Sequence, residues 1–173
     1  MTAGGSADGV DVYLGAGSNV DPVKHLRRAC AGLQSRFGAL RLSPVYQTTA
    51  VGFDGDDFLN LVVAFHTDAS PEAVVAVVED LHDQAGRVRG PNPISPRTLD
   101  LDLLLYGDAI IPDRAIRVPR DDVTRYAFVL RPLAELAPEL LHPQTGQSMA
   151  RLWADFPDKD ESMRRVDIDL LSD

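Results

Sequence analysis

Apolar residues recur along the first two thirds of the chain in two different patterns. Short apolar runs, which are typical of strands, flank two longer segments in which apolar residues return every three or four positions, as on one face of a helix. In the first segment these residues are Leu26, Ala29, Cys30, Leu33 and Phe37. In the second segment they are Val74, Val77, Val78, Leu81 and Ala85. Each segment opens on a capping residue followed by proline and ends before a glycine, which predicts two complete helices.

These patterns predict the order strand, helix, strand, strand, helix, strand. The expected strands cover 10–16, 40–47, 58–67 and 96–106, and the expected helices cover 22–37 and 71–85. The connections over 48–57 and 87–97 are too long, and too rich in glycine, aspartate or proline, for tight turns. This order is typical of a ferredoxin-like βαββαβ core, an α+β fold in which two helices cover one face of an antiparallel sheet.

The rest of the chain predicts C-terminal additions to that core. They are short edge strands over 110–111 and 115–118, helices over 126–136 and 148–156, and a solvated edge strand over 166–170. No repeat or linker divides the chain, and 173 residues suit one core. We therefore expect a flexible N-terminus over 1–9, a single domain over 10–156 and a C-terminal tail over 157–173.

Composition and charge narrow the class of protein. The chain is 45% hydrophobic and 25% charged, as in ordinary globular proteins, and its net charge of −9 argues against a general binder of nucleic acid or anionic membranes. No apolar run is long enough to span a bilayer, and residues 1–9 are too polar for a signal peptide. The one cysteine, Cys30, excludes an internal disulfide and lies on an apolar helix face, so we interpret it as a core residue. We expect a cytoplasmic protein.

The last strand of the predicted core carries two acidic residues on one face. Asp100 and Asp102 project to the same side of a strand whose other face is leucine, about 6–7 Å apart at the usual strand rise. Just upstream lie Arg87, Arg89 and Arg97, whose guanidinium groups suit phosphate oxygens. Carboxylates that bind Mg²⁺ beside arginines that bind phosphate predict a site for a metal–nucleotide complex. The alternative is a surface strand with solvated aspartates and incidental ion pairs.

Other kinds of site lack their motifs in this sequence. There is no P-loop, and the Gly15-Ala16-Gly17 turn lacks the third glycine of a dinucleotide site. The four histidines are scattered without zinc-ligand spacing, and no nucleophile elbow is present for a serine hydrolase. The metal–nucleotide site is therefore the favoured chemistry.

Six segments, in this order along the chain, resemble the 6-hydroxymethyl-7,8-dihydropterin pyrophosphokinase family. They cover residues 17–19, 43–48, 58–60, 86–89, 96–102 and 127–130. The most specific part runs from Gly-Arg-x-Arg to Pro-Arg-x-x-Asp-x-Asp. The resemblance implies a folate-pathway enzyme with a ferredoxin-like core. Such an enzyme transfers the β,γ-pyrophosphoryl group of ATP to the hydroxymethyl oxygen of the pterin and releases AMP.

The resemblance also implies roles at the phosphate end of the site. Asp100 and Asp102 would hold two Mg²⁺ ions that bridge phosphate oxygens. Arg87, Arg89 and Arg97 would neutralise the triphosphate of ATP, and the two aspartates with Arg87 and Arg97 would form the catalytic set. No strong general base is required, because the metal lowers the pKa of the hydroxyl.

At the pterin end, the resemblance implies a pocket of five residues. Asn60 would offer a donor and an acceptor to the edge of the ring. Phe58 and Phe128 would stack on its faces, with Thr48 and Asn19 lining or bracing the pocket. The alternatives are that Phe58 and Phe128 are plain core residues and that Asn60 is a strand-end amide.

Several positions depart from the family pattern. Arg120 stands where a histidine is usual, and Tyr126 replaces an arginine, with Arg125 one place earlier. His82 stands in place of a glutamate, and Ile94 lies about where a tryptophan is expected. Because Arg120 and Arg125 preserve positive charge, we expect both to contact ATP.

Two alternatives to an active enzyme remain open. One is a non-catalytic or weakly active relative that binds pterin or nucleotide. The other is a ferredoxin-like interaction domain with no substrate, although such a scaffold has no use for the charge pattern of two aspartates and three arginines. We expect ATP and the pterin as substrates, no nucleic-acid or membrane partner, and a monomer, with a homodimer as the alternative.

Overall fold

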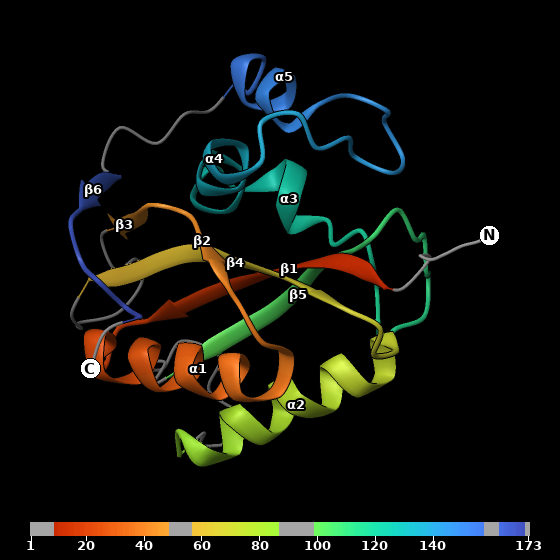
Figure 1. The fold of residues 1–173 in the computed structure, drawn as a ribbon. Coiled ribbons are helices and arrows are strands. Elements are labelled where there is room, and N and C mark those ends of the chain that lie inside the picture. Colours follow the sequence, from red (N-terminus) through yellow and green to blue (C-terminus); the bar gives the residue numbers. More distant parts are fainter. Residues whose placement is uncertain (1–8, 49–56, 87–98, 158–162, 172–173) are drawn as a thin grey trace.

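An antiparallel sheet, with six strands among the described residues, lies at the centre of the fold, with helices on both faces (Figure 1). The computed structural model describes residues 9–48, 57–86, 99–157 and 163–171. In these residues the strands are β1 (Val10–Ser18), β2 (Arg41–Leu42), β3 (Val45–Thr48), β4 (Phe58–Thr67), β5 (Asp100–Tyr106) and β6 (Arg164–Val166). The helices are α1 (Pro22–Phe37), α2 (Pro71–Gln84), α3 (Asp122–Arg125), α4 (Ala127–Leu136) and α5 (Met149–Ala154).

The strands lie side by side in the order β5-β1-β4-β3-β6, and β2 pairs with β4. Every pairing is antiparallel. The predicted α+β class, the antiparallel sheet and the order of its elements along the chain are confirmed. Strand β5, which carries the two predicted metal ligands, lies at one edge of the described sheet, with β1 as its neighbour.

The predicted second strand is divided in two at Ser43 and Pro44. Proline has no N–H for a strand ladder, so the pairing with β4 is interrupted there. The Ser43 side chain compensates, because its Oγ accepts a hydrogen bond from the Val62 backbone N at 2.8 Å. The Ser43 N–H in turn donates to the Val62 carbonyl oxygen at 2.9 Å. The prediction of a single strand over 40–47 is therefore wrong, because Pro44 divides this segment into β2 and β3.

Helices α1 and α2 cover one face of the sheet (Figure 1). Their apolar faces are buried as predicted, with Leu26, Leu33 and Val74 almost fully enclosed. Cys30 is 2% exposed within this core. This burial confirms its interpretation as a core residue and raises the pKa of its thiol to about 11.

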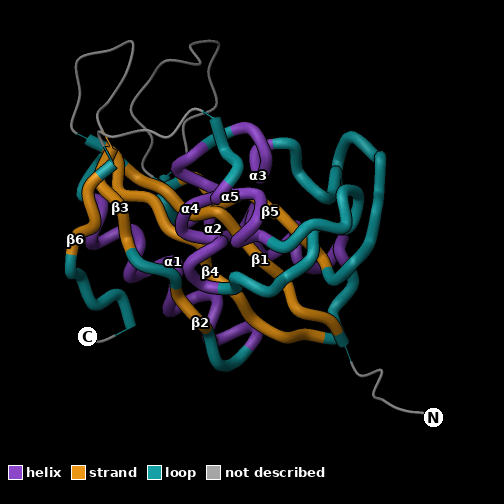
Figure 2. Tube along the Cα trace, turned by 90° about the horizontal axis from the view of Figure 1, so that it is seen from above, coloured by secondary structure: helices purple, strands orange, loops and turns teal. Residues whose placement is uncertain are grey.

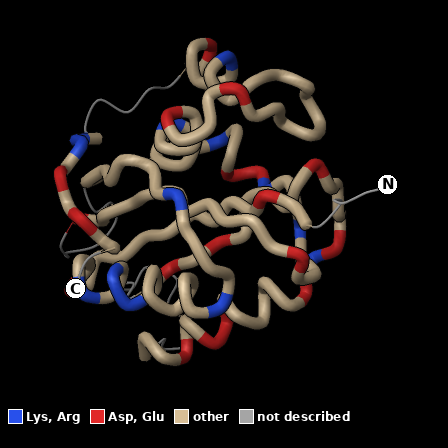
Figure 3. The backbone as a smooth tube through the Cα atoms, in the orientation of Figure 1, with Lys and Arg blue, Asp and Glu red and all other residues tan. Residues whose placement is uncertain are grey.

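Charge is divided between these two neighbouring helices (Figure 3). Helix α1 carries basic side chains and no acidic ones, whereas α2 carries acidic side chains and neither lysine nor arginine. An ion pair joins them, with Arg36 Nη2 at 2.8 Å from Asp80 Oδ2. Both side chains are about half exposed, so the pair contributes well under about 1 kcal/mol to stability.

Helices α3, α4 and α5 lie over the opposite face of the sheet (Figure 2). A second core forms there from Tyr13, Val62, Leu104, Leu130 and Leu133, among others. The predicted fold had helices on one face and C-terminal additions; those additions form a complete second layer. The five consecutive buried residues at 61–65 of β4 are the matching signal, because only a strand covered on both faces reads as a continuous apolar run.

The run of leucines at the end of β5 is explained by a β-bulge. In the ladder with β1, Tyr13 pairs with Leu105 while Leu14 pairs with Leu103, so Leu104 is the extra residue. Leu104 and Leu105 consequently both pack in the second core, whereas Leu103 packs against the first. The alternation that orients the acidic residues holds on the N-terminal side of this bulge.

The C-terminal predictions are met to different degrees. Helices α4 and α5 occupy the expected segments, but the predicted edge strands reduce to one bridge between Ile111 and Val118. β6 is an edge strand beside β3, and Leu170 beyond it is 3% exposed in the first core, so this segment is solvated on one side only. The division into domain and tail stays a prediction, and residues 1–8 lie outside the described residues.

Among the described helices, none combines the length and the hydropathy that a membrane span requires.

We predict that Leu130→Ala lowers the free energy of unfolding by about 2–5 kcal/mol, the usual cost of truncating a fully buried leucine. Urea unfolding measures this change, and we expect one cooperative transition because both cores share the sheet. Leu141→Ala is the matched control, since Leu141 is exposed and its truncation should shift the stability by no more than about 0.5 kcal/mol. Two separate transitions for Leu130→Ala would show that the second layer unfolds independently.

Candidate active site

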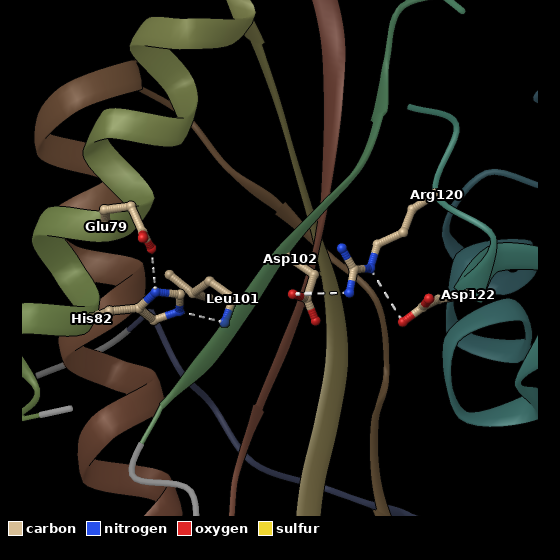
Figure 4. Close-up of polar contacts among 6 residues, drawn as sticks. All are labelled: Glu79, His82, Leu101, Asp102, Arg120 and Asp122. Atoms are coloured by element: carbon tan, nitrogen blue, oxygen red, sulfur yellow. Dashed lines mark hydrogen bonds and ion pairs between the residues drawn. The ribbon is translucent and has the colours of Figure 1, made fainter. Parts of the chain in front are cut away.

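The two predicted metal ligands lie at the start of β5, on the face of the sheet that α3 and α4 cover. Leu99, Leu101 and Leu103 pack into the opposite core, with α1 and α2. The Asp102 side chain points to the other side, toward Arg120 (Figure 4). The alternation predicted for this strand is confirmed.

The surroundings of Asp102 disfavour the charged form of its carboxylate. Burial, then the neighbouring Asp100 carboxylate, raise its pKa from 3.8 to about 6, while Arg120 opposes this rise. The Asp102 side chain is still 36% exposed, so it can be reached from solvent. A partly buried carboxylate pair whose charge the described cations do not fully offset is a good fit for a divalent cation.

Arg120 is the cation that the described structure places beside this pair. Its Nη2 lies 3.7 Å from Asp102 Oδ1, and its Nε lies 3.2 Å from Asp122 Oδ2 (Figure 4). Its backbone N donates to the Leu104 carbonyl oxygen at 2.9 Å, which ties this segment to β5. Sequence reasoning assigned Arg120 to ATP and missed Asp122, because no local pattern brings the segment before α3 against β5.

A polar cluster lies at the same end of the sheet, on β3 and β4. Asn60 Nδ2 donates to Thr48 Oγ1 at 3.2 Å, which orients the carboxamide. Asn19, just after β1, is almost completely buried. Three of the five residues predicted for the pterin pocket therefore lie on neighbouring parts of the sheet. Thr48 is on β3, Asn60 is on β4 and Asn19 directly follows β1.

Gly17 connects the polar cluster to the carboxylate pair. In the sheet register it pairs with Asn60 on β4 and with Asp100 on β5, so the three residues form one row on one face. Strand spacing puts Asp100 and Asn60 about 10 Å apart across this glycine. A Cβ at Gly17 would lie 2.6 Å from Asn60 Oδ1. The missing side chain therefore leaves the space above Gly17 to the Asn60 carboxamide.

The two predicted stacking residues differ in exposure. Phe58 is half-buried, and strand alternation puts it on the same face as Asn60. Phe128, at the start of α4, is 38% exposed and stacks on Tyr126 with ring centroids 5.3 Å apart. Phe128 is therefore not a plain core residue. Arg125, at the end of α3, is exposed.

Part of the predicted site lies outside the described residues, namely Arg87, Arg89 and Arg97. Within the described segments, no group of three or more histidine, cysteine, aspartate or glutamate side chains is arranged to bind a metal. Phosphate oxygens have the right chemistry to serve as further ligands of a cation at Asp100 and Asp102.

Comparison with known proteins decides the family. The family model described as 7,8-dihydro-6-hydroxymethylpterin-pyrophosphokinase (HPPK) matches residues 13–138. This chain belongs to that family. The match covers every described candidate residue of the site, whereas α5 and β6 lie beyond it.

Relatives of this pyrophosphokinase occur in bacteria and fungi. The 2-amino-4-hydroxy-6-hydroxymethyldihydropteridine pyrophosphokinase of Pseudomonas aeruginosa is 35% identical over 150 residues, covering 84% of this chain and 91% of the relative. The enzyme of that name from Aquifex aeolicus is 32% identical over 134 residues, covering 76% and 83%. The folic acid synthesis protein fol1 of Schizosaccharomyces pombe is 33% identical over 141 residues, covering 79% of this chain but 19% of the relative.

Solved structures share the fold of this pyrophosphokinase. The wild-type HPPK-DHPS of Plasmodium falciparum, crystallised with pterin and p-hydroxybenzoate, superposes with a TM-score of 0.70 at 14% identity. The superposition covers 93% of this chain and 47% of that one, so this chain spans less than half of the larger protein. At this identity the likeness concerns the fold alone.

We predict that Asp102→Asn stabilises the metal-free pyrophosphokinase at neutral pH. Because the pKa of Asp102 is raised to about 6 by folding, the folded protein binds more protons than the unfolded one, and stability falls between about pH 4 and pH 6. Above that window the substitution should raise the free energy of unfolding by about 1 kcal/mol, a value reduced for the screening of a partly exposed group.

Urea unfolding with a chelator at several pH values measures this effect. The difference between wild type and Asp102→Asn should be small near pH 4 and reach its full size above pH 6. Asp108→Asn, an exposed site in the turn after β5, is the control and should show no such pH dependence. An Asp102→Asn variant less stable than wild type at pH 7 would contradict the electrostatic assignment.

Proposed function

We propose that this chain transfers the β,γ-pyrophosphoryl group of ATP to the hydroxymethyl oxygen of 6-hydroxymethyl-7,8-dihydropterin. The α–β phosphoanhydride bond breaks, a new bond forms between that oxygen and the β-phosphorus, and AMP leaves as the hydroxyl loses its proton. The observation that carries the proposal is the row Asp100–Gly17–Asn60, which puts an acidic pair and an oriented amide on one face of the sheet. Membership of the pyrophosphokinase family supports the same reaction.

At the phosphate end, Asp100 and Asp102 would hold Mg²⁺, as two ions in our proposal. When bound, Mg²⁺ neutralises phosphate oxygens and lowers the pKa of the attacking hydroxyl. Arg120 lies 3.7 Å from Asp102, so its guanidinium can reach both this carboxylate and a phosphate beside it. We propose phosphate contacts for Arg87, Arg89, Arg97 and Arg125 from the sequence alone.

At the pterin end, Asn60 would hold the ring by its carboxamide. Its hydrogen bond to Thr48 uses one N–H, which leaves the second N–H and the oxygen for a donor–acceptor edge. Phe58 and Phe128 would stack on the ring, and the exposure of Phe128 supports this role because a free aromatic face is available. Asn19 would brace the pocket from its buried position after β1.

We propose a finer description for four further properties. The order β5-β1-β4-β3, with α1 and α2 on one face, supports the ferredoxin-like class for the core. We also propose two magnesium ions per active site, and a monomer that works in the cytoplasm.

The test of the function is AMP formation from ATP, Mg²⁺ and the hydroxymethyl pterin. We expect product only with all three, and a loss of kcat/KM on the order of 10³-fold in Asp100→Asn and Asp102→Asn, since each removes a charge interaction with the metal. Asp108→Asn is the matched control and should keep wild-type turnover. Binding of both ligands without AMP above background would establish the alternative, a non-catalytic binding relative that lost efficient transfer through the changes to Arg120 and Tyr126.

We predict a selective effect for Gly17→Ala. The new methyl group would meet Asn60 Oδ1 at 2.6 Å, so the carboxamide must move, whereas the fold tolerates the shift of a side-chain end. The KM for the pterin should rise by about 10-fold, the cost of one misplaced hydrogen-bonding group, with the KM for ATP unchanged. Steady-state kinetics with each substrate varied in turn measure this split.

Gly15→Ala is the matched control for this variant. The atoms nearest to a Cβ at Gly15, also on β1, belong to the Leu104 side chain and lie at the ordinary contact distance of 3.6 Å. Its kinetics should stay close to wild type. Equal effects of both variants on both substrates would reject a specific role for the Asn60 carboxamide.

A further inference from the structure

His82 approaches the metal-binding strand from the side opposite to the carboxylates. It lies on α2 with a side chain only 8% exposed, and its Nε2 accepts a hydrogen bond from the Leu101 backbone N at 2.9 Å (Figure 4). Its Nδ1 lies 2.9 Å from Glu79 Oε2, one turn back on the same helix. Leu101 is the residue between Asp100 and Asp102, so the imidazole acts on the backbone that joins the two metal ligands.

The donors and acceptors around His82 define its state. The Leu101 N–H can only donate, so Nε2 must be the unprotonated nitrogen that accepts. The proton of the neutral ring is then on Nδ1, where it donates to the Glu79 carboxylate. Glu79 thus orients the ring, and the ring orients the peptide. This arrangement resembles the outer shell of many metal sites, in which a second residue fixes the group that holds the metal.

The position in the sheet explains why this peptide needs an anchor. β5 pairs with β1 on one side and is an edge strand of the described sheet on the other. Asp100 is its first residue, and strand ends fray unless their outward groups are held. The two carboxylates also repel each other, which favours a displacement of the backbone between them. His82 stands where a neighbouring strand would otherwise supply the acceptor.

We propose that His82 is a positioning residue for the metal-binding carboxylates, which it acts on by holding the Leu101 amide. The inference rests on the proposed function, because it takes Asp100 and Asp102 to be the metal ligands. A neutral imidazole suits this place better than a carboxylate, since it accepts the hydrogen bond without adding a third negative charge behind the pair. His82 touches no reacting atom, so its effect passes entirely through β5.

Two isosteric variants separate the nitrogens of His82. The amide oxygen of His82→Gln can take the place of Nε2 and accept from Leu101, whereas the shorter side chain of His82→Asn reaches only the place of Nδ1. His82→Leu removes both contacts and keeps the apolar volume. Thermal unfolding of all three variants checks that each one is folded before binding is measured.

The readouts are metal affinity and the exchange of one amide. The affinity for Mn²⁺, measured by electron paramagnetic resonance with α,β-methylene-ATP, should fall by about 10–100-fold in His82→Asn and His82→Leu and by no more than about threefold in His82→Gln. Hydrogen exchange of the Leu101 amide, followed by NMR, should rise in the same two variants and stay protected in His82→Gln. The KM for the pterin should not change in any of them.

Two results would overturn the inference. One is wild-type Mn²⁺ affinity in His82→Asn and His82→Leu together with faster Leu101 exchange, which would make the hydrogen bond structural only. The other is an equal loss of affinity in His82→Gln, which would show that the acceptor is not what matters. Absence of AMP formation by the wild-type protein would reject the proposed function instead, and the Mn²⁺ and exchange measurements would still decide the role of His82.

Discussion

The repulsion between two carboxylates on one edge strand is the constraint that the surrounding structure answers. Asp100 and Asp102 share a face of β5, and the pKa of Asp102 shows that burial and this neighbour disfavour its charge. A strand with such residues stays in a sheet only if its other face and its backbone are well held. Leu99, Leu101 and Leu103 provide the first through the core with α1 and α2, and His82 provides the second through the Leu101 amide.

The two helical layers act on the site from opposite sides. The layer of α1 and α2 holds the backbone of β5, whereas the segment leading to α3 brings Arg120 to the carboxylates and the start of α4 carries the exposed Phe128. The bulge at Leu104 divides β5 into two parts. The residues before it include the two aspartates of the candidate site, whereas Leu104 and Leu105 pack in the second core. The layer that holds the backbone and the cation that pairs with Asp102 therefore lie on opposite faces of a single strand.

The departures from the family pattern acquire physical meaning in this arrangement. Arg120, at a position where a histidine is usual, pairs with Asp102 and Asp122. His82 replaces a glutamate of the family pattern, and its ring accepts a hydrogen bond from the Leu101 backbone N–H of the edge strand β5. Tyr126 replaces an arginine of the family pattern, and its ring stacks on the ring of Phe128. Three substitutions that looked unrelated along the chain thus cluster around β5 and the start of α4.

The sequence by itself determined the features that repeat within a few residues. The helix faces around Leu33 and Val74, the alternation around Asp102 and the order of the core elements follow from local periodicity, and the specific motifs indicated the family. It also contained a sign of the second helical layer, in the continuous apolar run of β4, and of the divided strand, in Pro44.

Only the tertiary structure decided which distant residues meet. The pairs Arg120–Asp102 and His82–Leu101, and the row that joins Asp100 to Asn60 across Gly17, depend on strand order and register. A one-residue change of register would turn each of these side chains to the opposite face, and no local pattern encodes that choice. Register is set by the packing of both cores together, which is why the site could be listed residue by residue from the sequence but not assembled.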